Sequence, residues 1–222
     1  MTIRPAANCA GVDGCATGWV VATRRGVVVI EHISAILGGA HDVIAIDIPI
    51  GLPSGEERLC EREARRYLSP RGSTIFPTPP RACLGARDYA DACARSLAVC
   101  GKKLSQQTWR IVPKIGEVDD ALAAADASRV IEVHPECAFA AMNGDVPLVT
   151  KHGSAGLAAR AALIEHEFGP IIARVAGAKH DDVLDAYAAL WSAERFARGD
   201  HRVMPATTTQ VDQRGLPMRI IF

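Results

Sequence analysis

Short runs of β-branched residues alternate with longer amphipathic or alanine-rich segments, a pattern that predicts strands interleaved with helices. The segment 9–32 contains GVDG and then the runs WVVA and VVVI, separated by the turn sequence RRG. These runs are too short for helices and rich in valine, so we expect three strands in an antiparallel meander. A short helix at 34–40, ending at two glycines, is predicted to follow.

The most apolar stretch of the chain is DVIAIDIPIG, a nearly continuous Val/Ile run that Pro49 and Gly51 stop. A run of this kind is expected of a strand covered on both faces, and hence of a sheet with helices around it. A further short strand, RVIEVHPE, closes at Pro135. The alternation of strands and helices favours an α/β fold.

Helix signals fill most of the remaining chain. We expect a helix over 54–69, with Ser54 as N-cap and Glu57 completing a capping box. The Pro-, Gly- and Ser-rich stretch 69–81 is predicted to be a loop. The other helical patterns are 86–107, the part of 112–127 that follows a loop, a segment ending near 168, a turn at 170–178, and 180–199.

Composition narrows the class of protein. The 222 residues favour one large domain, and 49% hydrophobic with 23% charged residues excludes disorder as the main state. Because 25 Lys+Arg balance 25 Asp+Glu, a protein whose main task is coating nucleic acid is disfavoured, although an enzyme with a local basic face is not. No apolar run approaches the roughly 18 residues of a membrane helix, and the N-terminus lacks the apolar segment of a signal peptide.

The seven cysteines form an odd set without a C-x-x-C pair. Such a set fits neither a disulfide framework nor a zinc ribbon. We therefore expect reduced thiols that serve as small core residues, in a cytoplasmic protein that does not bind membranes.

The placement of carboxylates is the most informative chemical feature. Asp13 ends the first predicted strand, Asp47 lies inside the most apolar strand, and Glu132 lies within VIEVH. Asp182 and Asp185 are three residues apart on the last helix and so share a face. An unpartnered buried carboxylate costs several kcal/mol, so converging carboxylates would need a cation. Oxygen ligands alone select Mg²⁺ or Mn²⁺ over zinc.

Each of these carboxylates also has a simpler explanation when it is taken alone. Asp13-Gly14 is a hairpin-turn dipeptide, Asp47 could cap the element after its strand, and Glu132 could face solvent. Acidic residues at 181, 182 and 185 are what the dipole of a helix N-terminus favours. It is their combination that favours a metal site.

A basic, proline-broken segment is the second chemical feature. Arg58, Arg62 and Arg65 are spaced four and three apart on the predicted helix and share a face. Arginine forks bind phosphate oxygens in pairs, although these arginines could equally pair with nearby glutamates on a solvated helix. The predicted substrate-binding residues are Arg58, Arg62, Arg65, Ser73, Thr74, Arg81, Lys114 and Lys151, the two lysines lying in predicted loops.

Several motifs occur together in a characteristic order: GVDGCATGWV, AIDIPIGLP, RLCEREAR with GSTIFPTPPR, PKIGEVDDAL, EVHPE and DDVLDAYAAL. In this order they resemble the family catalogued as domain of unknown function 429, described as predicted nucleases of ribonuclease H-like fold. The resemblance runs from about residue 10 to 200. It implies a mixed central sheet with an antiparallel three-stranded start, flanked by helices. The whole chain, 1–222, would form one domain with a mainly helical insertion at about 54–125.

The ribonuclease H-like pattern places acidic residues on the first strand, the fourth strand and a late helix. In this sequence the matching positions are Asp13, Asp47, Asp182 and Asp185, which the resemblance makes the catalytic ligands of Mg²⁺ or Mn²⁺. Glu132 is a further candidate ligand without a clear equivalent in that pattern. The implied reaction is two-metal hydrolysis of a nucleic-acid phosphodiester or another phosphoester. The late D-x-x-D resembles the Holliday-junction resolvase branch, whose members act as homodimers.

Two other classes of function stay open from the sequence. The turn DGCATG at 13–18 superficially fits the first phosphate loop of the sugar-kinase and actin group, although no second phosphate loop is evident. A binding module that keeps the fold without the chemistry is the other, and the balanced net charge is compatible with it. The retained carboxylates count against such a module, because buried acids are costly to keep.

Overall fold

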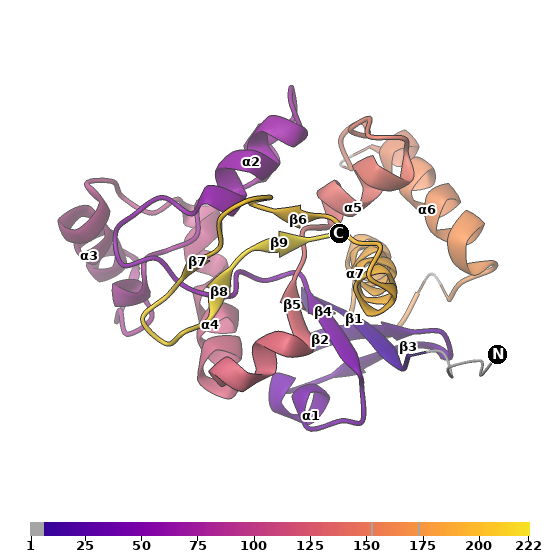
Figure 1. Cartoon of the computed structure of the whole chain (residues 1–222), viewed down its shortest axis with the longest axis horizontal. Helices are drawn as coiled ribbons and strands as arrows, with labels where there is room; N and C mark the ends of the chain where they lie inside the picture. The colour runs from indigo at the N-terminus through magenta and orange to yellow at the C-terminus, as the bar shows by residue number, and fades with distance from the viewer. Residues whose placement is uncertain (1–6, 152, 173) are drawn as a thin grey trace. The chain divides into compact units, whose positions relative to one another are not determined.

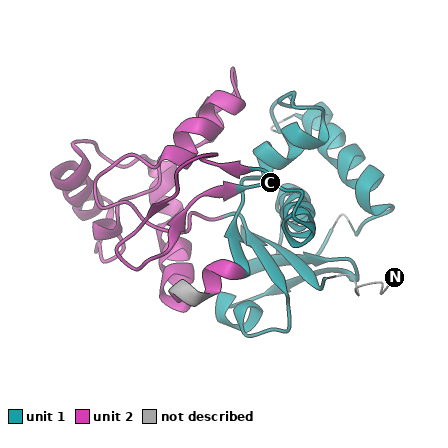
Figure 2. Cartoon of the chain, in the orientation of Figure 1, with its two compact units in different colours: residues 1–47, 129–202, 221–222 teal, residues 48–128, 203–220 magenta. Residues whose placement is uncertain are grey.

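The structure is a computed structural model that describes residues 7–151, 153–172 and 174–222. Its contacts divide the chain into two compact units, which Figure 2 distinguishes by colour. Unit 1 comprises 1–47, 129–202 and 221–222, and unit 2 comprises 48–128 and 203–220. Both units are discontinuous in sequence, so the chain leaves unit 1 after Asp47 and returns to it at Arg129.

Unit 1 is built on a five-stranded mixed sheet, shown in Figure 1. Its strands are β1 (Cys9–Cys15), β2 (Gly18–Thr23), β3 (Gly26–Ile30), β4 (Val43–Ile46) and β5 (Val130–Glu132). The order is β3-β2-β1-β4-β5, with β1 to β3 antiparallel and with β4 and β5 parallel to β1. The predicted meander and the mixed α/β class are both confirmed.

Four helices accompany this sheet: α1 (Ile33–Leu37), α5 (Pro135–Met142), α6 (Ser154–Phe168) and α7 (His180–Arg198). The long helix α7 packs on β1, β2 and β4, and α5 and α6 pack against α7. The helices expected at 34–40, up to 168 and at 180–199 are confirmed. The helical turn expected at 170–178 is wrong for the described residues of that segment, where two of the nine positions are Pro170 and Gly177.

Unit 2 is mainly helical. Its helices are α2 (Leu59–Tyr67), α3 (Tyr89–Cys100) and α4 (Gln106–Ala121), and short 3₁₀ turns span Gly72–Thr74, Arg81–Cys83 and Ala124–Ser128. Strands β7 (Gln210–Val211) and β8 (Pro217–Met218) form a hairpin, while β6 (Val203–Met204) pairs with β9 (Ile220–Ile221). A small core gathers Cys83, Ala92, Cys93 and Leu104.

Three helix boundaries predicted in unit 2 are wrong. The helix expected at 86–107 is interrupted, because Gly101 ends α3 with a left-handed backbone and Ser105 caps the start of α4. Residues 54–58 are not helical, because the backbone N–H of Ser54 binds the Glu56 carboxylate and Arg58 occupies the N-cap position of α2. The segment predicted as a loop around Pro113 instead lies within α4. The buried stripe of Val112, Ile115 and Val118 outweighs the one backbone hydrogen bond that a proline removes.

The cysteine side chains are mostly buried. All seven cysteines are free thiols, and six of them are buried; burial raises the pKa of the Cys83 thiol to about 11.

In the part of the chain that the structure describes, no helix has the length and apolar character needed to cross a membrane.

Candidate functional site

Asp13 and Asp47 lie at the carboxyl ends of two neighbouring parallel strands of unit 1. Val12 is in register with Ile46, and the N–H of Asp47 donates to the carbonyl oxygen of Val12 at 2.9 Å. Asp47 is therefore the first residue after β4. The sequence-based expectation that it lies inside the strand is wrong. Since alternate residues share a face, Asp13 points to the same side as Gly11, against which α7 packs.

Helix α7 brings two further carboxylates to this side of the sheet. Asp182, in its first turn, accepts a hydrogen bond at 2.9 Å from the backbone N–H of Lys179 and so caps the helix. Asp185 lies one turn further on and is only 4% exposed. Its Oδ1 atom is buried without a hydrogen-bond partner. We refer to Asp13, Asp47, Asp182 and Asp185 as the acidic cluster.

The electrostatics show that these carboxylates are mutually close. Burial, followed by the charges of Asp47, Asp185 and Asp182, raises the pKa of Asp13 well above its ordinary value. Burial and then Asp185 raise the pKa of Asp47 in the same way. The pKa of Asp185 is raised to about 6, chiefly by burial, and that of Asp182 is raised for the same reason. The charges of the helix carboxylate Asp185 and of the strand carboxylates thus act on one another.

The ammonium group of Lys151 contacts the acidic cluster directly. The Nζ atom of Lys151, in the turn before α6, lies 2.6 Å from Oδ2 of Asp185 and 3.7 Å from Oδ2 of Asp181. Burial lowers the pKa of Lys151, but attraction to Asp185, Asp47 and Asp13 outweighs it, so the net shift is upward. Lys151 therefore stays charged at every physiological pH. The sequence had suggested this lysine only as a phosphate contact.

Glu132 has a different orientation. It is in register with Ile46, and Ile46 is in register with Val12. Asp13 and Asp47 each follow these residues by one position, so strand alternation places the Glu132 side chain on the opposite face of the sheet. Its charge still contributes to the raised pKa of Asp47. We therefore do not group Glu132 with the acidic cluster.

Whether the acidic cluster suits a divalent cation can be judged from its atoms. Its donors are carboxylate oxygens, the ligands that Mg²⁺ and Mn²⁺ prefer, and the partnerless Oδ1 of Asp185 is an available buried donor. Within the described ranges, however, no group of three or more His, Cys, Asp or Glu side chains stands close enough to hold a metal ion. The oxygen donors of the acidic cluster are of the type that Mg²⁺ and Mn²⁺ prefer. They do not form a complete coordination shell in this structure, in which Asp185 is paired with Lys151.

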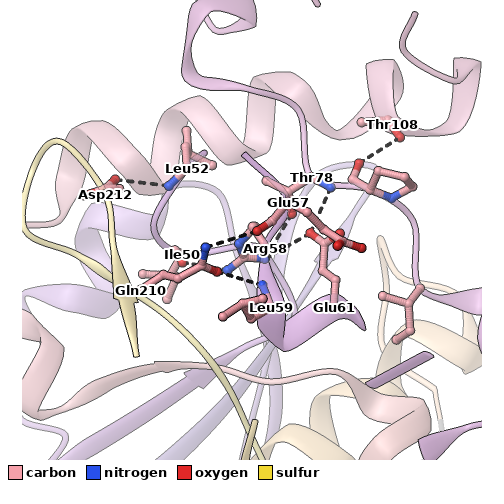
Figure 3. Close-up of polar contacts among 12 residues, drawn as sticks. Ile50, Leu52, Glu57, Arg58, Leu59, Glu61, Thr78, Thr108, Gln210 and Asp212 are labelled. Carbon is pink, nitrogen blue, oxygen red and sulfur yellow. Dashed lines mark hydrogen bonds and ion pairs between the residues drawn. The ribbon is translucent and has the colours of Figure 1, made fainter. Parts of the chain in front are cut away.

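Two of the arginines predicted to bind substrate, Arg58 and Arg65, form a structural network in unit 2, and Figure 3 shows its contacts around Arg58. Arg58 is 2% exposed and donates to the Ile50 carbonyl at 2.8 Å, to Thr78 Oγ1 at 3.0 Å and to Glu61 at 3.3 Å. Arg65 donates to Glu61 at 2.8 Å. This network lines part of a pocket of about 430 Å³ whose rim includes the exposed Lys102 and Lys103.

The other residues predicted to bind substrate are dispersed. Arg62 is 44% exposed and pairs loosely with Glu57, at 3.6 Å, whereas Arg81 forms a close ion pair with Asp119. Ser73 and Thr74 share a 3₁₀ turn, in which the Thr74 hydroxyl donates to the Arg71 carbonyl. Lys114 lies on α4 and not in a loop, since that helix continues through Pro113. Of the predicted substrate-binding residues, Lys151 is the one that the structure places at the acidic cluster.

A buried ion pair beside the cluster was missed from the sequence. Arg160 of α6 is fully buried and binds both carboxylate oxygens of Glu136, at 2.7 and 2.8 Å. The Glu136 charge contributes to the raised pKa values of Asp47 and Asp185. A lone arginine in the apolar run GLAARAALI is a signal that could have indicated a buried partner, because such a charge is costly unless it is paired.

Comparisons with known proteins give a family but no close relative. The family described as "Protein of unknown function (DUF429)" matches residues 11–210. No curated protein matches the chain. No solved structure matches it either.

Proposed function

The chain belongs to this family of unknown function, and we propose that it is a metal-dependent nuclease of ribonuclease H-like architecture. The observation that carries the proposal is that the buried Asp13 and Asp185 and the partly buried Asp47 all have raised pKa values, with Asp185 acting on both strand carboxylates. Keeping such acids together is costly. A divalent cation that uses them as ligands accounts for their retention.

The architecture supports the proposal through the positions of the acids. A ribonuclease H-like pattern expects them on the first strand, at the fourth strand and on a late helix. Here they lie on β1, directly after β4 and in the first turns of α7. The sheet order β3-β2-β1-β4-β5, with an antiparallel start, agrees with the same expectation.

In the proposed reaction Asp13, Asp47 and Asp185 would hold the divalent ions. Asp182, which caps α7, fixes the start of the helix that carries Asp185. When bound, divalent ions would lower the pKa of a water molecule and stabilise the leaving oxygen. The protein supplies the rest: β1 and β4 orient two carboxylates, and α7 orients the third. Burial keeps bulk water from screening their charges.

Cleavage assays test this proposal. Branched DNA, single-stranded DNA and RNA would be incubated with the full chain and Mn²⁺ or Mg²⁺, alongside Asp47→Asn and the control Lys103→Met, which changes an exposed residue of unit 2. Hydrolysis of one substrate that the control retains, and that Asp47→Asn reduces at least about a hundredfold, supports a nuclease. Cleavage that Asp47→Asn leaves unchanged would place the activity elsewhere and contradict the proposal.

A further inference from the structure

The ammonium group of Lys151 contacts Asp185, one of the carboxylates proposed to bind a divalent cation. We propose that this ammonium group is the built-in counter-ion of the metal-free cluster and competes with the divalent cation for Asp185. This inference rests on the proposed function, since it concerns the ion which that function requires. It makes Lys151 a residue that sets metal affinity, and not simply a contact to substrate.

The contact between Lys151 and Asp185 is close and specific. At 2.6 Å from Nζ, Oδ2 of Asp185 is already committed to a charge-assisted hydrogen bond. The other oxygen, Oδ1, is buried without a partner. A divalent ion could not take both oxygens while the ammonium stays in place, and two cations at this spacing would repel each other strongly in a buried site. Metal binding therefore requires the ammonium to move.

The fold holds Lys151 in this position. A Cβ atom added to Gly156 would lie 1.9 Å from the Thr150 carbonyl oxygen, so the turn that carries Lys151 packs directly on the backbone of α6. The buried Arg160 donates at 3.0 Å to the Val149 carbonyl, two residues before Lys151. Its bidentate pair with Glu136 anchors that guanidinium in turn. The lysine is thus preorganised at the cluster, unlike a lysine in a chance surface ion pair.

The Lys151 side chain is partly exposed and can move away from Asp185 into solvent. Its relative exposure is 34%, and four methylene groups let the ammonium reach solvent while the turn stays fixed. Two states of the cluster follow, one closed by the ammonium and one open to a metal ion. The apparent dissociation constant for metal rises in inverse proportion to the open fraction, so a cluster closed about 90% of the time binds about tenfold more weakly.

Calorimetric titration of Mn²⁺ into the full chain tests this competition. Lys151→Met should bind Mn²⁺ at least about tenfold more tightly than the wild type, and Lys151→Arg, which keeps the charge, should stay near the wild type. The matched control is Lys103→Met, which removes an exposed lysine charge from unit 2 and should change affinity less than about twofold. A merely structural lysine would give weaker binding when removed, not tighter binding.

A second measurement needs no substitution and so does not depend on a variant that folds. Amine acylation by an N-hydroxysuccinimide ester, followed by mass spectrometry, would report the reactivity of Lys151 relative to the exposed Lys103. Saturating Mg²⁺ should raise relative labelling of Lys151 several-fold, because the ammonium is released from Asp185. If the wild type binds metal but neither affinity nor labelling changes as expected, the competition is refuted and the proposed function stands. If neither the wild type nor any variant binds metal, the proposed function and the competition both fail.

Discussion

A Cβ atom added to Gly11 would lie 2.0 Å from the backbone nitrogen of Leu190 and 2.1 Å from the carbonyl oxygen of Ala186. Strand β1 and helix α7 therefore meet backbone to backbone, which a side chain at this position would prevent. Asp13 lies two residues further along the same face of β1, and Asp185 immediately precedes Ala186. The contact thus sets how closely the strand and helix carboxylates approach.

Gly11→Ala should destabilise the protein by at least about 3 kcal/mol, because both obstructing atoms belong to backbone that cannot rotate away. Urea unfolding followed by circular dichroism measures this. Gly116→Ala is the matched control: its Cβ would meet Leu84 only at 4.0 Å, and in a helix interior it should stabilise by about 0.5–1 kcal/mol. Equal, small effects of the two substitutions would contradict the close packing of β1 on α7.

Arg160→Met should cost about 3–5 kcal/mol, because it leaves the Glu136 carboxylate without its buried partner. Arg24→Met removes a comparably short pair with Glu194, but Arg24 is 58% exposed, so its loss should cost less than about 1 kcal/mol. Differential scanning fluorimetry of both variants checks the contrast. If Arg160→Met has the same melting temperature as the wild type, the bidentate pair does not anchor the turn that carries Lys151.

The stability of the metal-free protein should depend on pH through Asp185. Its pKa is raised to about 6 in the folded state, so the folded protein binds more protons than the unfolded chain between the two pKa values. The contribution of Asp185 is fully present below its unfolded pKa near 3.9 and is lost as the pH rises through about 6.

Comparison with Asp185→Asn isolates this effect, because the amide does not titrate. The stability of the wild type relative to the variant should fall by about 1–3 kcal/mol between pH 4 and pH 7.5. Lys151, Glu136 and Asp181 act on Asp185 in the wild type. Asp185 in turn raises the pKa of Asp13 and Asp47, so the variant also relieves these two carboxyls, which changes the difference in the same direction. Chemical denaturation in a chelator-containing buffer gives the difference; one that is independent of pH would mean that the pKa of Asp185 is not raised.

Two arginines of unit 2 should behave differently although they are only four residues apart. Arg58→Met should destabilise by about 3–5 kcal/mol, because Glu61 loses a buried partner. Arg62→Met should leave stability within about 0.5 kcal/mol. If Arg62 contacts a phosphodiester, its loss should weaken binding of the cleaved nucleic acid severalfold and reduce the salt dependence, as fluorescence anisotropy can measure. Unchanged binding would remove Arg62 from the substrate-binding residues.

Local sequence pattern was sufficient for the central sheet and for the long last helix. Short valine-rich runs and the RRG turn define the meander, and the apolar stretch before Asp47 identifies β4. The pattern failed where tertiary packing decides the outcome. Pro113 suggested a loop, but the buried stripe on either side of it keeps α4 continuous. Ser54 and Glu57 match the sequence pattern of a capping box, but they do not lie at the start of a helix, since α2 begins at Leu59.

The acidic cluster could be predicted in part, for a physical reason. Carboxylates in apolar strands stand out locally, because their burial is unfavourable without a partner. The partner itself comes from a distant part of the chain: Lys151 is 34 residues from Asp185, and no local spacing connects them. The register that turns Glu132 away from Asp13 and Asp47 is likewise a property of strand pairing, which the sequence of one strand does not contain.

Calorimetric titration of Mn²⁺ into the wild type and Asp47→Asn at pH 7.5 tests the central claim most directly. We expect saturable binding to the wild type in the micromolar to millimolar range and its loss in Asp47→Asn, with folding of the variant checked by circular dichroism. Absence of binding to the wild type up to millimolar Mn²⁺, or undiminished binding to Asp47→Asn, would contradict a metal site at the acidic cluster.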